Sequence, residues 1–321
     1  MKNKIVIIAG DPNSINSEII YKSWKKLNNK VKDRIYLIAN YKLIFKQLKK
    51  LKYKIKVLKV ENINQKSLTN SLKIIDVPLA FKDPFNVSLK SSSKYIINSL
   101  NFAHKIVSSN KIKGLINCPI NKRNIQSSKK IGVTEYLASK CKITDNSEVM
   151  MIYNNRLSVV PLTTHIKVRD VSKAITTNLI IKKVNTLEKQ FKKLFKKKPK
   201  IGILGLNPHN AELIKDSEEV KKILPAILKL KKIGINIKGP LVADTTFVNN
   251  YKRFNIIVGM YHDQVLSPFK SLFHFDAINI TLGLKYIRVS PDHGPALDLI
   301  KKNKSNYLSL LQCINFINNL K

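Results

Sequence analysis

Short runs of isoleucine, valine and leucine alternate along this chain with amphipathic segments, and this alternation restricts the fold more than any other feature. Such continuous apolar runs are typical of strands buried on both faces of a parallel sheet. The amphipathic segments have the period of surface helices, as in residues 179–197, where an apolar stripe lies opposite lysines. The pattern predicts an α/β fold with a largely parallel sheet. Strands are expected at Ile5–Ala9, Ile35–Ala39, Lys54–Val60, Gly114–Asn117, Leu157–Leu162, Ile201–Gly205 and Ile256–Tyr261.

The net charge is +39, from 59 basic and 20 acidic residues. An excess of this size can indicate nucleic-acid binding or another anionic partner. However, 53 of the basic residues are lysines, which are spread along the chain, whereas specific nucleic-acid sites usually use arginine. The chain also has 33 asparagines and 10 glycines, as expected of drift toward A/T-rich codons. We therefore favour drift, and we expect no specific nucleic-acid partner, although the positive field would attract anionic substrates.

The sequence has no apolar run of about 18 residues, so a membrane-spanning helix is not expected. The apolar run at Ile5–Ala9 is too short for the core of a signal peptide, which predicts a cytoplasmic protein. Cys118, Cys141 and Cys313 are widely spaced and form no CxxC pair. Neither a disulfide framework nor a cysteine-based zinc site is therefore expected.

Three of the six histidines follow predicted strands. His165, His209 and His262 come shortly after the apolar runs that begin at Leu157, Ile201 and Ile256. Ligands of parallel α/β sheets bind beyond the carboxyl ends of the strands, so the three imidazoles could converge there on a metal ion. Any one of them alone would more simply be a hydrogen-bonded loop histidine. Their shared setting favours a metal site, although their spacing matches no local metal motif.

Charged and polar residues near these histidines extend the candidate site. Asp244 and Asp263 could each accept a proton or orient a histidine ligand, or could simply be turn-forming or helix-capping residues. Lys270, Asn279 and Arg288 could donate to a phosphate or carboxylate.

Motifs in a fixed order resemble the 4-hydroxythreonine-4-phosphate dehydrogenase family of pyridoxal phosphate biosynthesis. The resemblance spans nearly the whole chain, and eight motifs in the same order are a specific signal. They are Gly10-Asp11-Pro12 followed by Glu18, Asn117–Lys122, Gly132–Leu137, Thr163-Thr164-His165 with Arg169-Asp170-Val171, Gly205–His209, Gly239–Phe247, Met260–Gln264, and Asn279–Gly283 with Arg288 and Asp292-His293-Gly294.

The resemblance implies two α/β/α domains with a cleft between them, as in the isocitrate and isopropylmalate dehydrogenases. We expect a first domain over residues 1–128, with residues 300–321 packing back on it, and a second over residues 129–299 that carries the metal. The resemblance also implies a homodimer whose site lies at the subunit interface.

The implied enzyme is an oxidoreductase. It would oxidise the C3 hydroxyl of 4-phosphooxy-L-threonine with NAD or NADP, and decarboxylation would give 3-amino-2-oxopropyl phosphate. By resemblance, one divalent metal (Zn, Mg or Co) is held by the three histidines His165, His209 and His262. The residues that would contact the substrate are Thr134, Lys270, Asn279 and Arg288. Lys270, Asp244 or Asp263 would transfer a proton, and His293 and Gly294 would contact the cofactor.

The chain departs from the family pattern at several positions. Val133 stands where the family has a substrate-binding histidine, Pro295 replaces a threonine after His293-Gly294, and glycines are missing after Asp11 and after His209. Two alternatives follow. One is a related decarboxylating dehydrogenase for another phosphorylated or acidic hydroxy compound. The other is a basic binding protein that keeps the fold and has lost catalysis.

Overall fold

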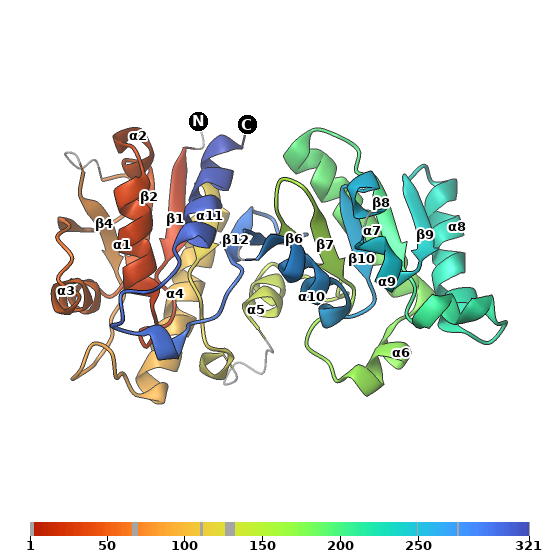
Figure 1. The fold of residues 1–321 in the computed structure, drawn as a ribbon. Coiled ribbons are helices and arrows are strands. Elements are labelled where there is room, and N and C mark those ends of the chain that lie inside the picture. The colour runs from red at the N-terminus through yellow and green to blue at the C-terminus, as the bar shows by residue number, and fades with distance from the viewer. Residues whose placement is uncertain are drawn as a thin grey trace. The chain divides into compact units, whose positions relative to one another are not determined.

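The structure, a computed structural model, describes residues 3–65, 70–109, 112–125, 132–248, 250–274 and 276–320. The chain forms two compact units (Figure 1): Met1–Cys141 together with Lys285–Lys321, and Lys142–Leu284. We call them unit 1 and unit 2 and describe each by itself. No helix in the described part of the chain combines the length and the apolar character needed to cross a membrane.

Unit 1 is built on parallel strands in the order β3-β4-β2-β1-β5-β12. The central strands are buried along their whole length, because helices cover both of their faces. The strands are β1 (Lys4–Ile8), β2 (Ile35–Ala39), β3 (Val57–Val60), β4 (Leu72–Asp76), β5 (Ile112–Asn117) and β12 (Arg288–Pro291).

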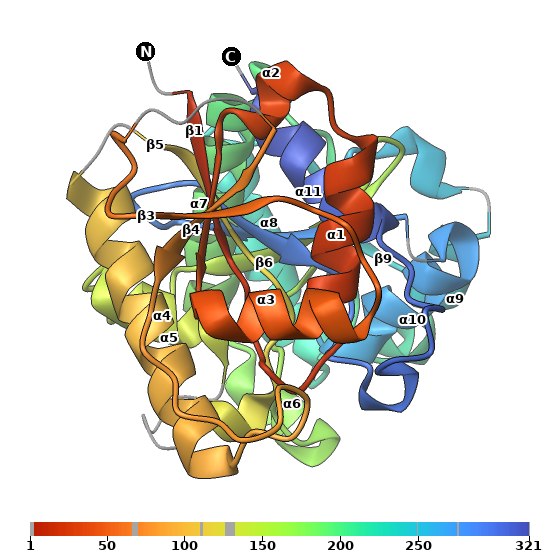
Figure 2. The same ribbon diagram turned by 90° about the vertical axis from the view of Figure 1, so that its left-hand side faces the viewer.

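The helices of unit 1 lie on the two faces of this sheet. Figure 2 shows α1 (Asn16–Lys26) and α11 (Leu308–Asn319) on one face and α4 (Leu89–Ser109) on the other. Helix α11 comes from the end of the chain and packs against α1, β5 and β12. The remaining helices are α2 (Asn29–Lys32), α3 (Tyr41–Lys50) and α5 (Val133–Lys140).

Unit 2 has the strand order β11-β6-β7-β10-β8-β9. Pairing is antiparallel from β11 to β6 and from β6 to β7, and parallel between β7, β10, β8 and β9. The strands are β6 (Val149–Tyr153), β7 (Ser158–Pro161), β8 (Ile201–Leu204), β9 (Ile237–Leu241), β10 (Ile256–Gly259) and β11 (Ile278–Leu282).

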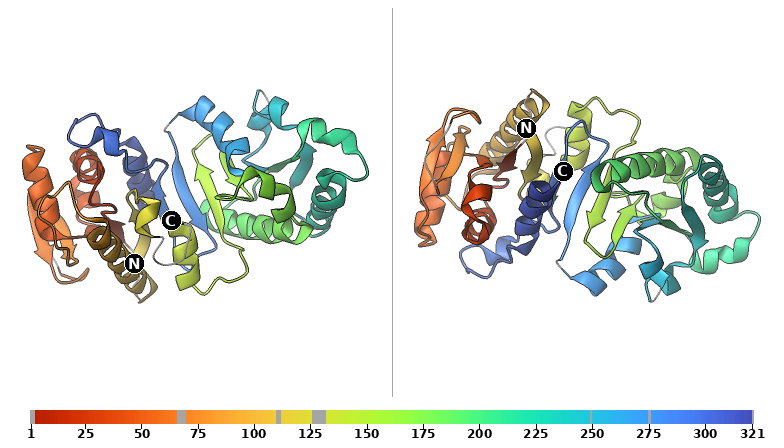
Figure 3. Two further views of the ribbon diagram at one scale, coloured as in Figure 1. Left: turned by 90° about the horizontal axis from the view of Figure 1, so that it is seen from below. Right: turned by 90° about the horizontal axis from the view of Figure 1, so that it is seen from above.

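Helices also cover both faces of the unit 2 sheet. Figure 3 shows α7 (Thr177–Phe195) and α8 (Leu224–Lys232) on one face and α10 (His262–Phe273) on the other. Helix α10 buries Val265, Leu266 and Phe269 in a cluster with residues of β7 and β10. Two one-turn helices, α6 (Val171–Ala174) and α9 (Ala243–Thr246), lie in the loops after β7 and β9.

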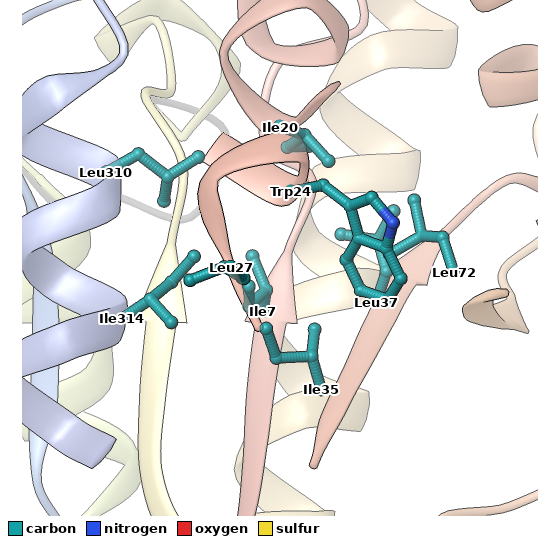
Figure 4. Close-up of a pocket in the computed structure, with 9 residues that line it drawn as sticks. All are labelled: Ile7, Ile20, Trp24, Leu27, Ile35, Leu37, Leu72, Leu310 and Ile314. Carbon is teal, nitrogen blue, oxygen red and sulfur yellow. The ribbon is translucent and has the colours of Figure 1, made fainter. Parts of the chain in front are cut away.

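A small cavity lies in the core of unit 1 (Figure 4). Side chains from α1, α11 and the strands line it, and its volume is about 10 Å³. That is barely the space of one water molecule, and a water there would need polar partners. The lining is apolar, so we treat the cavity as a packing defect and not as a ligand site. Its lining residues are Ile7, Ile20, Trp24, Leu27, Ile35, Leu37, Leu72, Leu310 and Ile314.

The prediction of an α/β fold with a largely parallel sheet is confirmed, and each predicted apolar run contains a strand. Thr177–Phe195 confirms the helix predicted over residues 179–197. Strands β4, β6, β9, β11 and β12 were not predicted. Some of these carry polar residues within the strand, such as Asn279 in β11 and Ser290 in β12, and their apolar runs are therefore short.

The division into units differs from the boundaries expected from sequence. Residues 132–141 and 285–299 were expected in the second domain, but they group with unit 1. The reason is local pairing, because β12 pairs with β5 and α5 contacts α4. A hydrogen bond of 2.8 Å from the Tyr136 hydroxyl to Asn101 Oδ1 fixes α5 to α4.

Helix α11 supplies a test of how unit 1 is held together. Ile317 is fully buried, and a Cβ atom on Gly114 of β5 would lie only 2.7 Å from its side chain. We predict that Ile317→Ala lowers the free energy of unfolding by about 2–5 kcal/mol, because it leaves a cavity in this contact. Leu308→Ala, on the same helix but 48% exposed, is the control and should change it by less than about 0.5 kcal/mol. Urea titration measures both, and equal effects would contradict the packing described.

Candidate active site at the strand ends

The carboxyl ends of β7, β10 and β8 lie side by side, because the three strands are parallel neighbours. The register pairs Gly259 of β10 with Pro161 of β7, so both strands end at the same level. Beyond this point the two segments remain hydrogen-bonded to each other. Thr163 donates to the carbonyl of Met260 through its amide at 3.2 Å and through its hydroxyl at 2.7 Å. The segments that carry the first and third strand-end histidines are thus fixed to one another.

His165 and His262 lie next to each other as a result. Their ring centroids are 6.2 Å apart and the ring planes are inclined by 36°. His262 is the first residue of α10, and Nδ1 of its ring lies 2.6 Å from Oδ1 of Asp263. A carboxylate on one ring nitrogen fixes the orientation of the imidazole and leaves the other nitrogen, Nε2, for a ligand. This contact suits the orienting role considered for Asp263 from sequence, which stays a prediction.

His209 lies in the loop after β8 and is more exposed. Its side chain is 69% exposed, and Nδ1 lies 3.5 Å from Oε1 of Glu212. The backbone here is unusual, because five consecutive residues, 209–213, have φ between 47° and 58° and none of them is glycine. A left-handed backbone costs a residue with a Cβ atom roughly 1–2 kcal/mol. The family pattern has glycines in this stretch, so their replacement here by Ala211 and Leu213 leaves strain beside His209.

Two glutamates hold the start of this loop. Oε1 of the fully buried Glu219 accepts hydrogen bonds from the amides of Leu206 and Asn207 at 2.7 and 2.8 Å. Burial alone would raise the pKa of Glu219, but hydrogen bonds from Asn207 and Leu206 outweigh it and lower the pKa. Glu218 accepts from Ser172 and Asn207, and these bonds also lower its pKa. Both carboxylates are therefore anchors for the loop.

The three histidines are suitable ligands for a divalent metal by their chemistry, and two of them also lie close enough together. Imidazole nitrogen is a common ligand of zinc and similar ions, and His165 and His262 are adjacent. However, no group of three histidine, cysteine or acidic side chains in the described residues of this single chain is placed to hold a metal.

The remaining candidates of unit 2 lie on different elements. Asp244 is exposed on α9 and accepts the amide of Thr245 at 2.6 Å. Lys270 is half-buried on α10, seven residues after Asp263, which places both on one side of the helix. Asn279 lies on β11, and its Oδ1 atom is buried with no hydrogen-bond partner in the described residues. A buried acceptor without a protein partner suits a residue that contacts a ligand.

In unit 1, Arg288 and Thr134 come together. Arg288 is 3% exposed at the start of β12, where Nε donates to Oδ1 of Asn117 at 2.6 Å and Nη1 donates to Oγ1 of Thr134 at 3.4 Å. Burial lowers the pKa of Arg288 to about 10, so the side chain stays charged at neutral pH. A buried guanidinium held in this way is prepared for an anion. Val133 begins α5 directly before Thr134.

The predicted cofactor residues lie in a loop tied to the start of the chain. Nδ1 of His293 lies 2.9 Å from the carbonyl oxygen of Gly294, and the Pro295 carbonyl accepts the amide of Ile15 at 3.3 Å. The first loop is itself held by the buried Asp11, whose Oδ2 accepts from Asn124 at 2.7 Å. Burial raises the pKa of Asp11.

Sequence reasoning missed four residues that hold these groups in place. Asn117 and Asp11 lie within quoted motifs, but nothing in the spacing shows that one binds Arg288 and the other fastens the first loop. Gln264 is the last residue of the quoted motif Met260–Gln264, and the binding of a loop by Glu219 was not predicted. The contacts of these residues depend on tertiary structure, and only their burial or motif position could have indicated a role.

Comparison with known proteins gives consistent results. The family model "Pyridoxal phosphate biosynthetic protein PdxA" matches residues 30–317. A 4-hydroxythreonine-4-phosphate dehydrogenase of Aquifex aeolicus is 37% identical, with 100% of this chain and 99% of the relative covered. The crystal structure of a 4-hydroxythreonine-4-phosphate dehydrogenase from Klebsiella pneumoniae has a TM-score of 0.85 at 25% identity, covering 99% of this chain and 97% of that one. An isocitrate dehydrogenase from Methylococcus capsulatus shares the fold alone, with a TM-score of 0.50 at 10% identity over 99% of this chain and 85% of that one.

The left-handed loop after β8 gives a test of the site backbone. We predict that Ala211→Gly raises the free energy of unfolding by roughly 0.5–1 kcal/mol. Relief of the backbone strain contributes about 1–2 kcal/mol, and the greater freedom of unfolded glycine offsets part of it. Ala174→Gly, at the end of helix α6, is the control and should lower stability. Denaturant unfolding compares the two, and a loss of stability in both variants would contradict a left-handed residue 211.

Proposed function

Because the chain belongs to the pyridoxal phosphate biosynthetic protein PdxA family, we propose that it is the oxidoreductase that oxidises 4-phosphooxy-L-threonine with NAD or NADP. Loss of carbon dioxide from the resulting β-keto acid gives 3-amino-2-oxopropyl phosphate. The observation that carries the proposal is the adjacent pair His165 and His262 at neighbouring strand ends, in a chain that matches such enzymes over its full length. The match favours this activity over a non-catalytic basic protein.

The phosphate of the substrate is assigned to the buried cation of unit 1. Arg288 is oriented by Asn117 and lies beside the hydroxyl of Thr134, which can donate a further hydrogen bond. A charge-assisted bond from a fixed guanidinium is stronger than one from a mobile surface lysine. Asn279, with its buried and unpartnered Oδ1, is assigned to a donor group of the substrate.

Proton transfer is assigned to α10 and α9. Lys270 is half-buried, and a lysine in that position can accept the proton of the reacting hydroxyl or return one after decarboxylation. Asp263 is committed to His262 and so acts chiefly by orienting it. Asp244 is exposed on α9 and is the second candidate for the proton transfer.

A nicotinamide cofactor is assigned to the loop of His293 and Gly294 together with the first loop of the chain. A hydrogen bond from the amide of Ile15 to the carbonyl of Pro295 joins the two segments. The cofactor accepts the hydride, and the protein supplies its position. Proline removes one backbone donor at residue 295, and we expect the neighbouring amides to serve in its place.

A divalent metal is assigned to His165, His209 and His262. Such an ion polarises the hydroxyl oxygen of the substrate as a Lewis acid. Since the described residues of one chain do not assemble three ligands, we propose that the site is completed in a homodimer. The site would then lie at the subunit interface.

Exposed apolar side chains support a second copy as the partner. Val168 follows His165 and is 74% exposed, Ile214 follows His209 and is 63% exposed, and Val248 follows α9 and is 67% exposed. These residues lie on the same loops as the candidate metal and proton-transfer residues. Apolar residues concentrated on functional loops are typical of an interaction surface. All three cysteines are buried and free, which suits the reducing cytoplasm, the compartment we propose.

The activity is tested by following the reduction of NAD and NADP with 4-phosphooxy-L-threonine. We expect turnover that chelation abolishes and that Zn, Mg or Co restores. His262→Asn should remove bound metal and turnover without unfolding the chain, because it removes a ligand imidazole. His274→Asn, at the other end of α10, is the control and should keep both. Full turnover of metal-free protein would contradict the metal assignment, and no turnover of metal-loaded protein would contradict the proposed substrate.

The homodimer is tested by light scattering. We predict that the double variant Val168→Asp with Ile214→Asp is folded but monomeric and loses turnover, because two carboxylates would be buried in the interface. Leu228→Asp is the matched control, since Leu228 is also 63% exposed but lies on α8, away from these loops. A double variant that remains dimeric would place the interface elsewhere.

A further inference from the structure

Gln264 connects two of the strand ends that carry the histidines. It lies in the first turn of α10, two residues after His262. Its Oε1 atom accepts the amide of Met260 at 2.7 Å, at the end of β10. Its Nε2 atom donates to the carbonyl of Gly205 at 2.7 Å, at the end of β8. One side-chain amide therefore connects the segment that leads to His262 with the segment that leads to His209.

The backbone at both strand ends is shaped to allow this connection. A Cβ atom on Gly259 would lie 2.9 Å from Oε1 of Gln264 and would also collide with Val265. A Cβ atom on Gly205 would lie 3.0 Å from Oε1 of Glu219 and would collide with Asn210. The two glycines thus leave the space that the side chains of Gln264 and Glu219 occupy.

Glu219 also binds the segment that follows β8, at the two residues after Gly205. Its Oε1 accepts the amides of Leu206 and Asn207, directly after the carbonyl that Gln264 binds. Between them the two side chains bind two consecutive peptide groups, those that join Gly205 to Leu206 and Leu206 to Asn207. The path of the chain from β8 toward His209 is therefore defined by these bonds, in a region where the following residues adopt a strained backbone.

Glutamine can make both bonds of this connection, whereas an ionised glutamate cannot. The group must accept from one backbone amide and donate to one backbone carbonyl at the same time, and glutamine has one acceptor and one donor group at the end of its side chain. Glutamate has the same shape but no donor, and its charge would face the carbonyl of Gly205.

We propose that Gln264 is a positioning residue that fixes the paths of the segments leading to His209 and to His262, and thereby the affinity of the metal sites of the homodimer for a divalent metal. This inference rests on the metal assignment of the proposed function. Outer hydrogen-bond partners of metal ligands typically change metal affinity by 10–100-fold when they are altered. Gln264 acts on the backbone that carries the ligands, and we expect an effect of the same size.

The experiment measures Co²⁺ binding to the intact chain by its visible absorption spectrum and by competition with a chelator. We expect Gln264→Glu to weaken Co²⁺ binding by roughly 10–100-fold and to alter the spectrum. Circular dichroism and urea unfolding of the metal-free protein show whether the variant is folded. Gln264→Met, which is similar in size but makes neither bond, should weaken binding in the same direction.

The matched control is Gln47→Glu. Gln47 is also buried, and its Nε2 donates to the carbonyls of Pro12 and Pro84 at 2.8 and 2.7 Å, in unit 1. Gln47→Glu also removes donors to buried carbonyls and should lower stability, but it should keep the wild-type Co²⁺ affinity and spectrum. If Gln264→Glu is folded and binds Co²⁺ like the wild type, the positioning role is wrong. If the wild type itself binds no Co²⁺, the metal assignment of the proposed function fails instead.

Discussion

Parallel pairing of β10 with β7 and β8 is the constraint on which the candidate site depends. Parallel neighbours end at the same edge of a sheet, and the residues that follow each strand must share that edge. In unit 2, hydrogen bonds continue this pairing past the strands, from Thr163 to Met260 and from Gln264 to Gly205. The first bond joins the segments that carry His165 and His262, and the second joins the start of α10 to the segment that leads to His209. The chemistry proposed for the site depends on this backbone, and the side chains that donate to substrate or metal are carried on it.

Buried polar groups play the corresponding part in unit 1. Arg288 would be costly to bury alone, and Asn117 offsets that cost while it directs the guanidinium group. Asp11 similarly accepts several hydrogen bonds and keeps the first loop next to Asn124. In both cases a polar group is fixed before any ligand arrives. Binding of the proposed substrate phosphate at Arg288 would then require little reorganisation of the protein, which is the general advantage of a preorganised site.

Sequence reasoning predicted the fold correctly and named candidate residues, but it did not show how these residues are held. The continuous apolar runs predicted β1, β2, β7, β8 and β10 correctly, because a strand buried on both faces has few polar residues. It did not find β11 and β12, whose polar residues Asn279 and Arg288 belong to the candidate site and interrupt the apolar pattern. It also could not show that Glu219 and Gln264 bind the loops, since these contacts join residues 12 to 59 positions apart. The left-handed backbone at residues 209–213 was equally hidden, because Ala211 and Leu213 do not suggest it.

The central claim is that the ends of β7 and β10 present His165 and His262 to one divalent ion. The most direct measurement is an anomalous difference map from crystals of the protein grown with Co²⁺, recorded at the cobalt absorption edge. The account predicts a single strong peak per active site, within bonding distance of both imidazoles, with Nε2 of His262 as its ligand and Nδ1 still on Asp263. A cobalt ion bound elsewhere, with His165 and His262 free of metal, would contradict it.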